Sequence, residues 1–325
     1  MELRTTGGAA AFVPSPLPPD LDLSWPLVNA FGRAEGSIGY LGGVCRGLPD
    51  SHLLVPLFVR REAGLSSRLE GKQKPREVMS YVAALEYGLV RMPPMPNSLQ
   101  LSRELHGILS EEQPTERHTP SEFRPEVNYA ALEAFERFLH AESHLPALIR
   151  LAVVHYQFEA IYPFLDDNGR VGRLLITLLL HTEKLLDQRL LYLSAFFDEH
   201  RDEYNDRLFA VSSRGAWGEW LDFFLRAVHD QANDAVERAI ALLQLRDEYR
   251  RRITVARQSV LLLAMIDRLF QSPAVTITGL ARDVGASYPA AKQNVEKLVA
   301  AGILEPLSDT RNKVYMAREI LALIE

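Results

Sequence analysis

Apolar residues recur at helical spacing along most of the chain, and alternation typical of strands is confined to its last part. Helices are predicted over residues 56–69, 77–90, 99–109, 129–139, 146–161 and 169–186. Pro163 must end the fifth of these helices, because proline lacks the backbone N–H that a helix interior requires. The pattern therefore predicts an all-α fold for the main body of the protein.

An aromatic stripe follows at helical spacing and predicts a further buried helix. Its members are Trp217, Trp220, Phe223, Phe224 and Val228. Residues 230–252 are charged on one face and are predicted to close the helical bundle. The charged run DEYRRR ends at Arg252 and is typical of a domain boundary.

Residues 253–325 carry a different pattern. Helices are predicted over 259–270, 279–284 and 288–300, with Gly285 in a turn and Gly302 ending the third helix. Two short strand-like stretches, ILEPL and KVYMA, flank the polar turn SDTRN. Three short helices followed by a hairpin predict a small winged helix-turn-helix domain.

Composition predicts a soluble, two-domain, cytoplasmic protein. The chain has 325 residues, of which 47% are hydrophobic and 24% charged, and residues 1–34 are expected to form an extended arm around PSPLPP. The longest nearly apolar run, residues 174–180, is too short to span a bilayer, and no secretory signal is visible. The single cysteine, Cys45, cannot form an internal disulfide. A net charge of −6 argues against general coating of nucleic acid.

The stretch HYQFEAIYPFLDDNGRVGR, residues 155–173, joins two predicted helices through a loop suited to phosphate. Asn168, Gly169 and Arg170 open the second helix, where free backbone N–H groups and the helix dipole favour an anion. Arg170 and Arg173 add positive charge, whereas Asp166 and Asp167 would repel a bare phosphate. A divalent cation between carboxylate and phosphate reconciles the two, so the residues predict a Mg-nucleotide site.

This stretch resembles the Fic motif, His-Pro-Phe-x-Asp/Glu-Gly-Asn-Gly-Arg-x-x-Arg. The matching positions are Pro163, Phe164, Asp166, Asn168, Gly169, Arg170 and Arg173. The resemblance implies a Fic-type helical domain over residues 35–252, with the motif loop at 162–173 and ATP and Mg²⁺ as cofactors. It implies AMP transfer to a protein hydroxyl, with Asp166 on Mg²⁺ and Arg173 on the γ-phosphate. Asn168, Gly169 and Arg170 would hold the phosphates.

A second match lies upstream. SSRLEG is similar to the Ser/Thr-x-x-x-Glu-Gly/Asn signature of the Fic inhibitory helix, here expected near residues 56–71 with Ser66, Glu70 and Gly71 at the signature positions. The resemblance implies that Glu70 pairs with Arg173 and keeps the γ-phosphate out of its productive position. Taken alone, the same six residues are typical of an ordinary capped helix.

Two motif positions depart from the family. Tyr162 stands where the family has the His that takes the proton from the target hydroxyl, and a Tyr with a pKa near 10 is a poor base at pH 7. Tyr162 either fills the space of the imidazole or is itself the acceptor hydroxyl for self-modification. Asp167 stands at a Gly position, and Asp tolerates the left-handed backbone. His155 is expected to be a core histidine.

A third departure is an absence. Residues 110–128 are rich in proline and charge and leave little room for the β-hairpin that docks targets in the family. The expected function is a Fic-family protein that keeps a Mg-nucleotide site, is impaired or altered as an adenylyltransferase and acts as a regulatory or partner-binding module. The first alternative is an active AMP transferase with Glu70 as its brake.

The second alternative is a DNA-binding regulator that acts through the C-terminal domain, which resembles a module appended to many Fic proteins. Ser287 is expected to cap the recognition helix. The candidate nucleic-acid contacts are Lys292, Gln293, Lys297, Arg311 and Lys313. Expected partners are a nucleotide, a protein target or the protein itself, and DNA, with no membrane. A homodimer is expected from the family.

Overall fold

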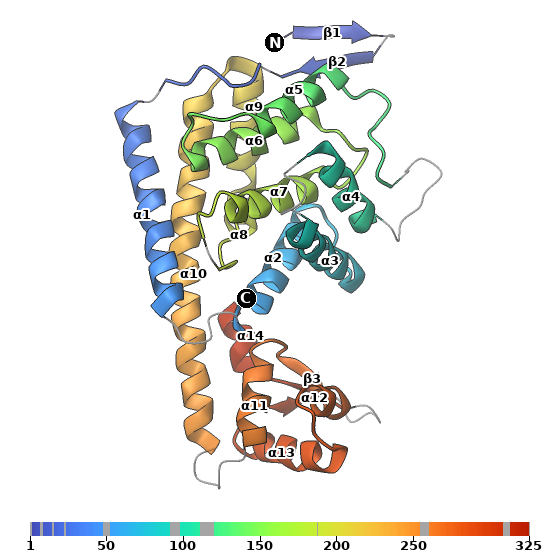
Figure 1. Cartoon of the computed structure of the whole chain (residues 1–325), viewed down its shortest axis with the longest axis vertical. Helices are drawn as coiled ribbons and strands as arrows, with labels where there is room; N and C mark the ends of the chain where they lie inside the picture. The colour runs from blue at the N-terminus through green and yellow to red at the C-terminus, as the bar shows by residue number, and fades with distance from the viewer. Residues whose placement is uncertain are drawn as a thin grey trace. The chain divides into compact units, whose positions relative to one another are not determined.

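The computed structural model describes residues 2–6, 9–14, 16–22, 24–47, 53–91, 98–110, 120–186, 188–253, 260–307 and 313–324. The chain forms two compact units, Met1–Gly43 with Glu62–Asn233, and Val44–Arg61 with Asp234–Glu325 (Figure 1). Three helices run across this division: α1 (Trp25–Gly47), α2 (Val55–Leu69) and α10 (Trp217–Ile253). The division therefore does not coincide with the boundary predicted after residue 252.

The first unit contains most of the predicted helical body. Its remaining helices are α3 (Pro75–Arg91), α4 (Leu99–Ser110), α5 (Tyr129–His140), α6 (Ala147–Ile161), α7 (Asn168–Thr182), α8 (Ser194–Glu199) and α9 (Arg201–Arg214). The predicted helices up to residue 161 are confirmed to within two residues at each end. Helix α7 ends before the predicted residue 186, because Lys184 adopts a left-handed backbone with φ of 53°.

Helix α7 lies at the centre of this unit and packs against α3, α4 and α6 (Figure 1). Every residue from Asn168 to Leu180 is buried, which explains why its sequence is apolar nearly all round. The aromatic stripe of α10 is confirmed as core, and the indole N–H of Trp220 donates to the carbonyl of Ala152 on α6 at 3.0 Å. The loop before α7 is thus built on a rigid, fully buried helix.

The predicted N-terminal arm is shorter than expected. Strands β1 (Glu2–Thr6) and β2 (Ala9–Val13) pair as an antiparallel hairpin, and α1 already begins at Trp25. Residues 25–34, expected to be extended, are therefore helical. The helical signal is carried by small residues: Ala30 and Ala34 are buried at four-residue spacing, and Pro26 is tolerated in the first turn.

The last part of the second unit combines short helices with a small sheet. The helices are α11 (Val260–Leu269), α12 (Ile277–Asp283), α13 (Tyr288–Ala300) and α14 (Arg318–Ile324). Strands β3 (Ala274–Thr276), β4 (Glu305–Pro306) and β5 (Val314–Met316) form an antiparallel sheet in the order β3-β5-β4. The helices and the hairpin were predicted, whereas the three-residue β3 was not. Helix α14 was not predicted either.

Two local signals in this region are also confirmed. The hydroxyl of Ser287 accepts from the N–H of Ala290 and caps α13, and Gly302 follows that helix with a φ of 67°. No helix in the described part of the chain has both the length and the apolar character needed to cross a membrane.

Candidate functional site

The loop between α6 and α7 is framed by two residues in the left-handed conformation. Tyr162 has φ 50° and ψ 62°, and Asp167 has φ 59° and ψ 11°. The left-handed backbone predicted for Asp167 is confirmed, and each such non-glycine residue costs roughly 1–2 kcal/mol. Arg124 holds the loop from outside, because its Nε donates to the carbonyl of Tyr162 at 2.7 Å and its backbone N–H donates to Pro163 at 2.9 Å.

Asn168 fixes the interior of the loop. Its Oδ1 accepts from the backbone N–H of Phe164 and its Nδ2 donates to the Phe164 carbonyl, both at 2.8 Å. The Phe164 ring is buried and stacks on the imidazole of His106, with centroids 4.0 Å apart. Both the oxygen and the nitrogen of the Asn168 side-chain amide are therefore hydrogen-bonded to the loop backbone, although Asn168 was predicted to bind phosphate.

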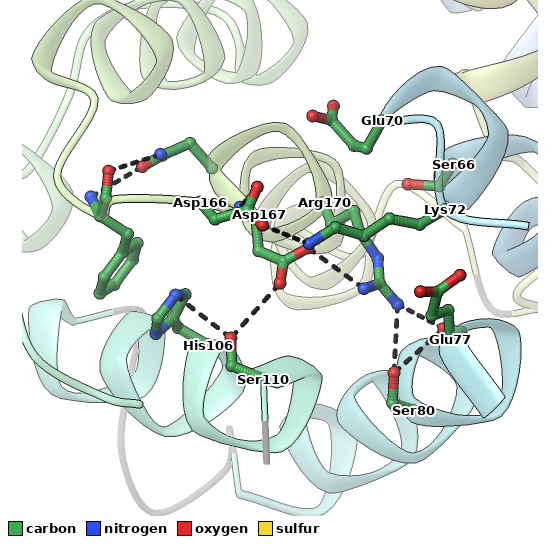
Figure 2. A network of polar contacts seen from close by, with 12 residues as sticks. Ser66, Glu70, Lys72, Glu77, Ser80, His106, Ser110, Asp166, Asp167 and Arg170 are labelled. Carbon is green, nitrogen blue, oxygen red and sulfur yellow. Dashed lines mark hydrogen bonds and ion pairs between the residues drawn. The ribbon is translucent and has the colours of Figure 1, made fainter. Parts of the chain in front are cut away.

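Arg170 is fully buried and points toward α3 (Figure 2). Its guanidinium donates to Asp167 Oδ1 at 3.1 Å and to Ser80 Oγ at 3.2 Å, and also to the carbonyl of Glu77. Arg170 was predicted to contact phosphate. That contact stays a prediction, and in this structure the guanidinium joins the motif loop to α3.

Arg173 is held by the end of α2. Its Nε donates to Ser66 Oγ at 2.8 Å, and its Nη2 donates to the Ser66 carbonyl at 2.9 Å and to Glu70 Oε1 at 3.0 Å. The ion pair expected between Glu70 and Arg173 is thus present. The Glu70 carboxylate also lies against the start of α7, since a Cβ added to Gly169 would come within 2.1 Å of Glu70 Oε1. That is the position where a helix favours an anion.

Lys72 belongs to the site although no motif in the sequence pointed to it. Its ammonium lies 2.7 Å from Asp166 Oδ2 and 2.8 Å from Asp167 Oδ1 (Figure 2). Asp167 is only 3% exposed and also accepts from the hydroxyl of Ser110 at 3.3 Å. A buried carboxylate without a cation would be costly, so these contacts explain how Asp is accommodated at a glycine position.

The acidic pair does not fit a divalent cation in this arrangement. Both carboxylates are already bridged by Lys72, and Asp167 is also paired with Arg170. Within the described ranges, no group of three or more His, Cys, Asp or Glu side chains is placed to hold a metal. The charge that a metal was predicted to neutralise at Asp166 is therefore balanced by the chain itself.

Neither aromatic candidate is a good proton acceptor. Tyr162 is 46% exposed, and its partial burial together with the charges of Glu70 and Glu159 raises its pKa, which disfavours the phenolate. His155 is confirmed as a core residue, with Nε2 2.9 Å from the Tyr204 hydroxyl. Burial, followed by the nearby positive charge of Arg173, lowers the pKa of His155 to about 3. It stays neutral at physiological pH.

Glu159 is a second residue that sequence reasoning missed. It lies on α6 about one helical turn before Tyr162. Burial, reinforced by the charge of Glu70 and opposed by Arg173, raises the pKa of Glu159 to about 7. Its Oε1 is buried and has no hydrogen-bond partner among the described residues. With this pKa, the Glu159 carboxyl changes between its protonated and ionised forms near neutral pH.

Two other groups of predictions lie elsewhere. The nucleic-acid candidates belong to the second unit, where Lys292, Gln293 and Lys297 are exposed on α13 and Lys313 is exposed before β5. Lys292 lies 4.0 Å from Glu296, and Arg311 falls outside the described residues. The predicted lack of a target-docking hairpin depends largely on residues 111–119, which also lie outside them.

Comparison with known proteins gives matches at both motifs. Residues 97–180 match the model of the Fic/DOC family, and residues 28–75 match that of the Fic/DOC family N-terminal region. A Fic family protein from Desulfovibrio desulfuricans G20 is 18% identical, with a TM-score of 0.54 over 92% of this chain and 98% of that one. This likeness supports a shared fold.

Two further solved structures are similar over shorter parts of the chain. Fic-1 (aa134–508) from C. elegans is 22% identical, with a TM-score of 0.47 over 68% of this chain and 75% of that one. A Fic domain containing signaling protein from Bacteroides thetaiotaomicron VPI-5482 is 15% identical, with a TM-score of 0.48 over 65% of this chain and 97% of that one.

Proposed function

We propose, from the matches to the Fic/DOC family and its N-terminal region, that the chain binds ATP at the start of α7 and that Glu70 restrains this binding. We further propose that AMP transfer through the site is weak, so that the protein acts as a nucleotide-responsive regulatory module. A mostly helical Fic fold is consistent with AMPylation-type chemistry.

The contact between Glu70 and Arg173 carries the proposal. A guanidinium fork binds carboxylate or phosphate in the same two-point fashion, so one anion excludes the other. Arg173 is buried and held through Ser66, while the Glu70 carboxylate lies on Gly169 at the start of α7. An incoming terminal phosphate would meet this carboxylate at both the arginine and the helix start.

We propose that AMP transfer is weak because the described part of the site lacks a good acceptor for the proton of the attacking hydroxyl. The attacking hydroxyl oxygen forms a bond to the α-phosphorus, pyrophosphate leaves, and the hydroxyl proton must go to a base. A positioned base typically contributes about 10² to 10⁴ in rate. Tyr162 stands at the family's base position and its raised pKa disfavours the form that would accept a proton. Fic proteins typically use ATP with Mg²⁺, but Lys72 balances Asp166 here, so no step is assigned to a metal.

An active AMP transferase restrained by Glu70 is the second candidate. One observation favours it: Glu159 lies about one helical turn before Tyr162, and its pKa of about 7 suits a general base at neutral pH. If Glu159 accepts the proton, the parent protein already transfers AMP and Glu159→Gln removes that transfer. If the first proposal holds, the parent and Glu159→Gln show the same weak transfer.

Calorimetry with ATP tests the restraint. Replacing Glu70 by Gly should raise ATP affinity about tenfold or more, equivalent to about 1.4 kcal/mol, because Arg173 and the helix start become available. Glu122→Gly, at an exposed position in the loop before α5, removes the same side chain away from the site and should leave affinity unchanged. Equal affinity in the parent and Glu70→Gly would contradict the restraint.

A second arm of this experiment tests the chemistry. The combination of Tyr162→His, Asp167→Gly and Glu70→Gly restores the family residues at the motif and removes the restraint. Mass spectrometry after incubation with ATP should then show added AMP on the protein itself, above the level of Glu70→Gly alone. Strong transfer by the unaltered chain that is lost in Tyr162→Phe would mean that Tyr162 is a functional acceptor.

A further inference from the structure

The ammonium of Lys72 occupies a bridging position between two carboxylates of the motif loop (Figure 2). Its Nζ lies 2.7 Å from Asp166 Oδ2 and 2.8 Å from Asp167 Oδ1, which are distances of charge-assisted hydrogen bonds. A cation between two carboxylates at the end of the motif loop, directly before α7, is the arrangement that a divalent metal would provide. Here an amino group of the chain provides it.

The turn that carries Lys72 is fixed at its backbone. Gly71 has a φ of 70°, which glycine adopts without strain, and the N–H of Lys72 donates to the carbonyl of Ser67 at 2.8 Å. The side chain of Lys72 is only 13% exposed. A tethered cation of this kind has a high effective concentration at the carboxylates, so a free metal ion has to compete with it.

The charges of the cluster are balanced without any added ion. Asp166 and Asp167 contribute two negative charges, and Lys72 and Arg170 contribute two positive ones. A divalent cation placed between the carboxylates would lie within a few ångströms of the Lys72 ammonium, and like charges at that distance repel. Metal binding therefore requires the displacement of Lys72.

We propose that Lys72 is a tethered cation that takes the place of a divalent metal, so that a nucleoside triphosphate binds this loop with little dependence on Mg²⁺. An ammonium has three N–H donors, of which two meet Asp166 and Asp167, and we infer that the third donates to a phosphate oxygen when nucleotide binds. The second half of this inference rests on the proposed nucleotide site, whereas the exclusion of metal from the carboxylates does not.

Binding of Mn²⁺ in the absence of nucleotide tests the first half. The parent protein should bind Mn²⁺ weakly, and Lys72→Met should bind it about tenfold or more tightly, because Asp166 and Asp167 both lose the ammonium that bridges them. Lys74→Met removes the same charge from an exposed position two residues further on and should resemble the parent. Lys72→Arg keeps a cation and should also resemble the parent, even if Lys72→Met proves unstable. Equal Mn²⁺ affinity in Lys72→Met and the parent, or weak binding by the parent that Lys72→Arg does not reproduce, would overturn the exclusion.

Calorimetry with ATP, in EDTA and then in Mg²⁺, tests the second half. The parent should bind ATP with affinities that differ by less than about threefold between the two conditions, whereas Lys72→Met should lose about tenfold or more in EDTA and regain it with Mg²⁺. A parent that depends on Mg²⁺ as strongly as Lys72→Met would overturn the inference. If no variant binds ATP under either condition, the proposed nucleotide site itself is wrong, and the Mn²⁺ experiment still decides the position of Lys72.

Discussion

Asp167 carries a negative charge in a conformation and a setting that both cost free energy. Its backbone is left-handed and its side chain is almost fully buried. The cost is offset by ion pairs with Lys72 and Arg170 and by the hydroxyl of Ser110. These partners come from the turn after α2, from α7 and from α4. A single aspartate at a glycine position therefore ties three segments of the site together.

The burial of the Glu159 carboxyl predicts that the free energy of unfolding depends on pH. Burial raises the pKa of Glu159 to about 7 from its usual value near 4.5, so the folded state binds the proton more tightly than the unfolded state. The stabilising contribution of Glu159 to the free energy of unfolding is fully present below pH 4.5 and is lost as the pH rises through 7. The loss amounts to at most about 3 kcal/mol. Glu159→Gln removes this dependence.

Urea unfolding between pH 5 and pH 8 measures the effect. The stability of Glu159→Gln relative to the parent should increase as the pH rises across this range, because only the parent must ionise a buried carboxyl. Glu142→Gln, on the exposed loop between α5 and α6, controls for the loss of one charge. A difference between Glu159→Gln and the parent that stays constant from pH 5 to pH 8 would rule out the burial of Glu159 as described.

At the scale of secondary-structure elements, the close approach of α6 and α7 depends on Gly172. A Cβ added there would lie 2.5 Å from Glu159 Oε1, 3.3 Å from Phe158 Cδ1 and 3.4 Å from His155 Cε1. Overpacking costs roughly 1–3 kcal/mol, and the better helix propensity of Ala returns at most about 1 kcal/mol. Gly172→Ala should therefore lower the free energy of unfolding by up to about 2 kcal/mol.

Gly32 on α1 is the matched comparison for this prediction. It is also a helical glycine, but an added Cβ would meet nothing within 4 Å. Gly32→Ala should therefore be neutral or stabilising by up to about 1 kcal/mol, through helix propensity alone. Urea midpoints of the two variants decide the question. If both changes shift the midpoint in the same direction by the same amount, packing between α6 and α7 is not the cause.

The elements differ in how far the sequence predicts them. Helices such as α4 and α6 follow from apolar spacing, and the partnership of Glu70 with Arg173 follows from two motifs read together. Helix α1 was missed in part because it is rich in glycine, which lowers helix propensity, although Leu27, Ala30, Ala34, Ile38, Leu41 and Cys45 are buried at helical spacing. Lys72 was missed because its partner Asp166 lies 94 positions away, and no local pattern records a contact of that kind. Glu159 was missed for a related reason, since its proton affinity depends on burial by other elements.

At the scale of the whole molecule, the chain has two units with different chemistry. The first holds the motif loop and its ion pairs, whereas the second holds the exposed cations of α13. The overall charge of −6 gives no general attraction for nucleic acid, so any binding to DNA has to come from a local face. The exposed face of α13 carries both positive and negative side chains, because Glu296 lies beside Lys292. DNA binding is therefore a prediction that depends on a small number of phosphate contacts.

The salt dependence of binding tests this prediction. For B-DNA, log K falls with log salt at a slope of about −0.9 for each phosphate contact, so Lys292→Ala with Lys297→Ala should flatten the slope by about 1.8 if both residues meet phosphates. The motivation is α13 itself, which is capped by Ser287 and exposes both lysines. The double variant Lys74→Ala with Arg137→Ala removes two exposed cations from the first unit and should leave the slope unchanged.

Failure of the parent to shift a pool of genomic fragments even at low salt would contradict DNA binding. The exposed face of α13 would then be better explained as a surface that docks a protein, where two lysines beside a glutamate change the rate of association more than the affinity.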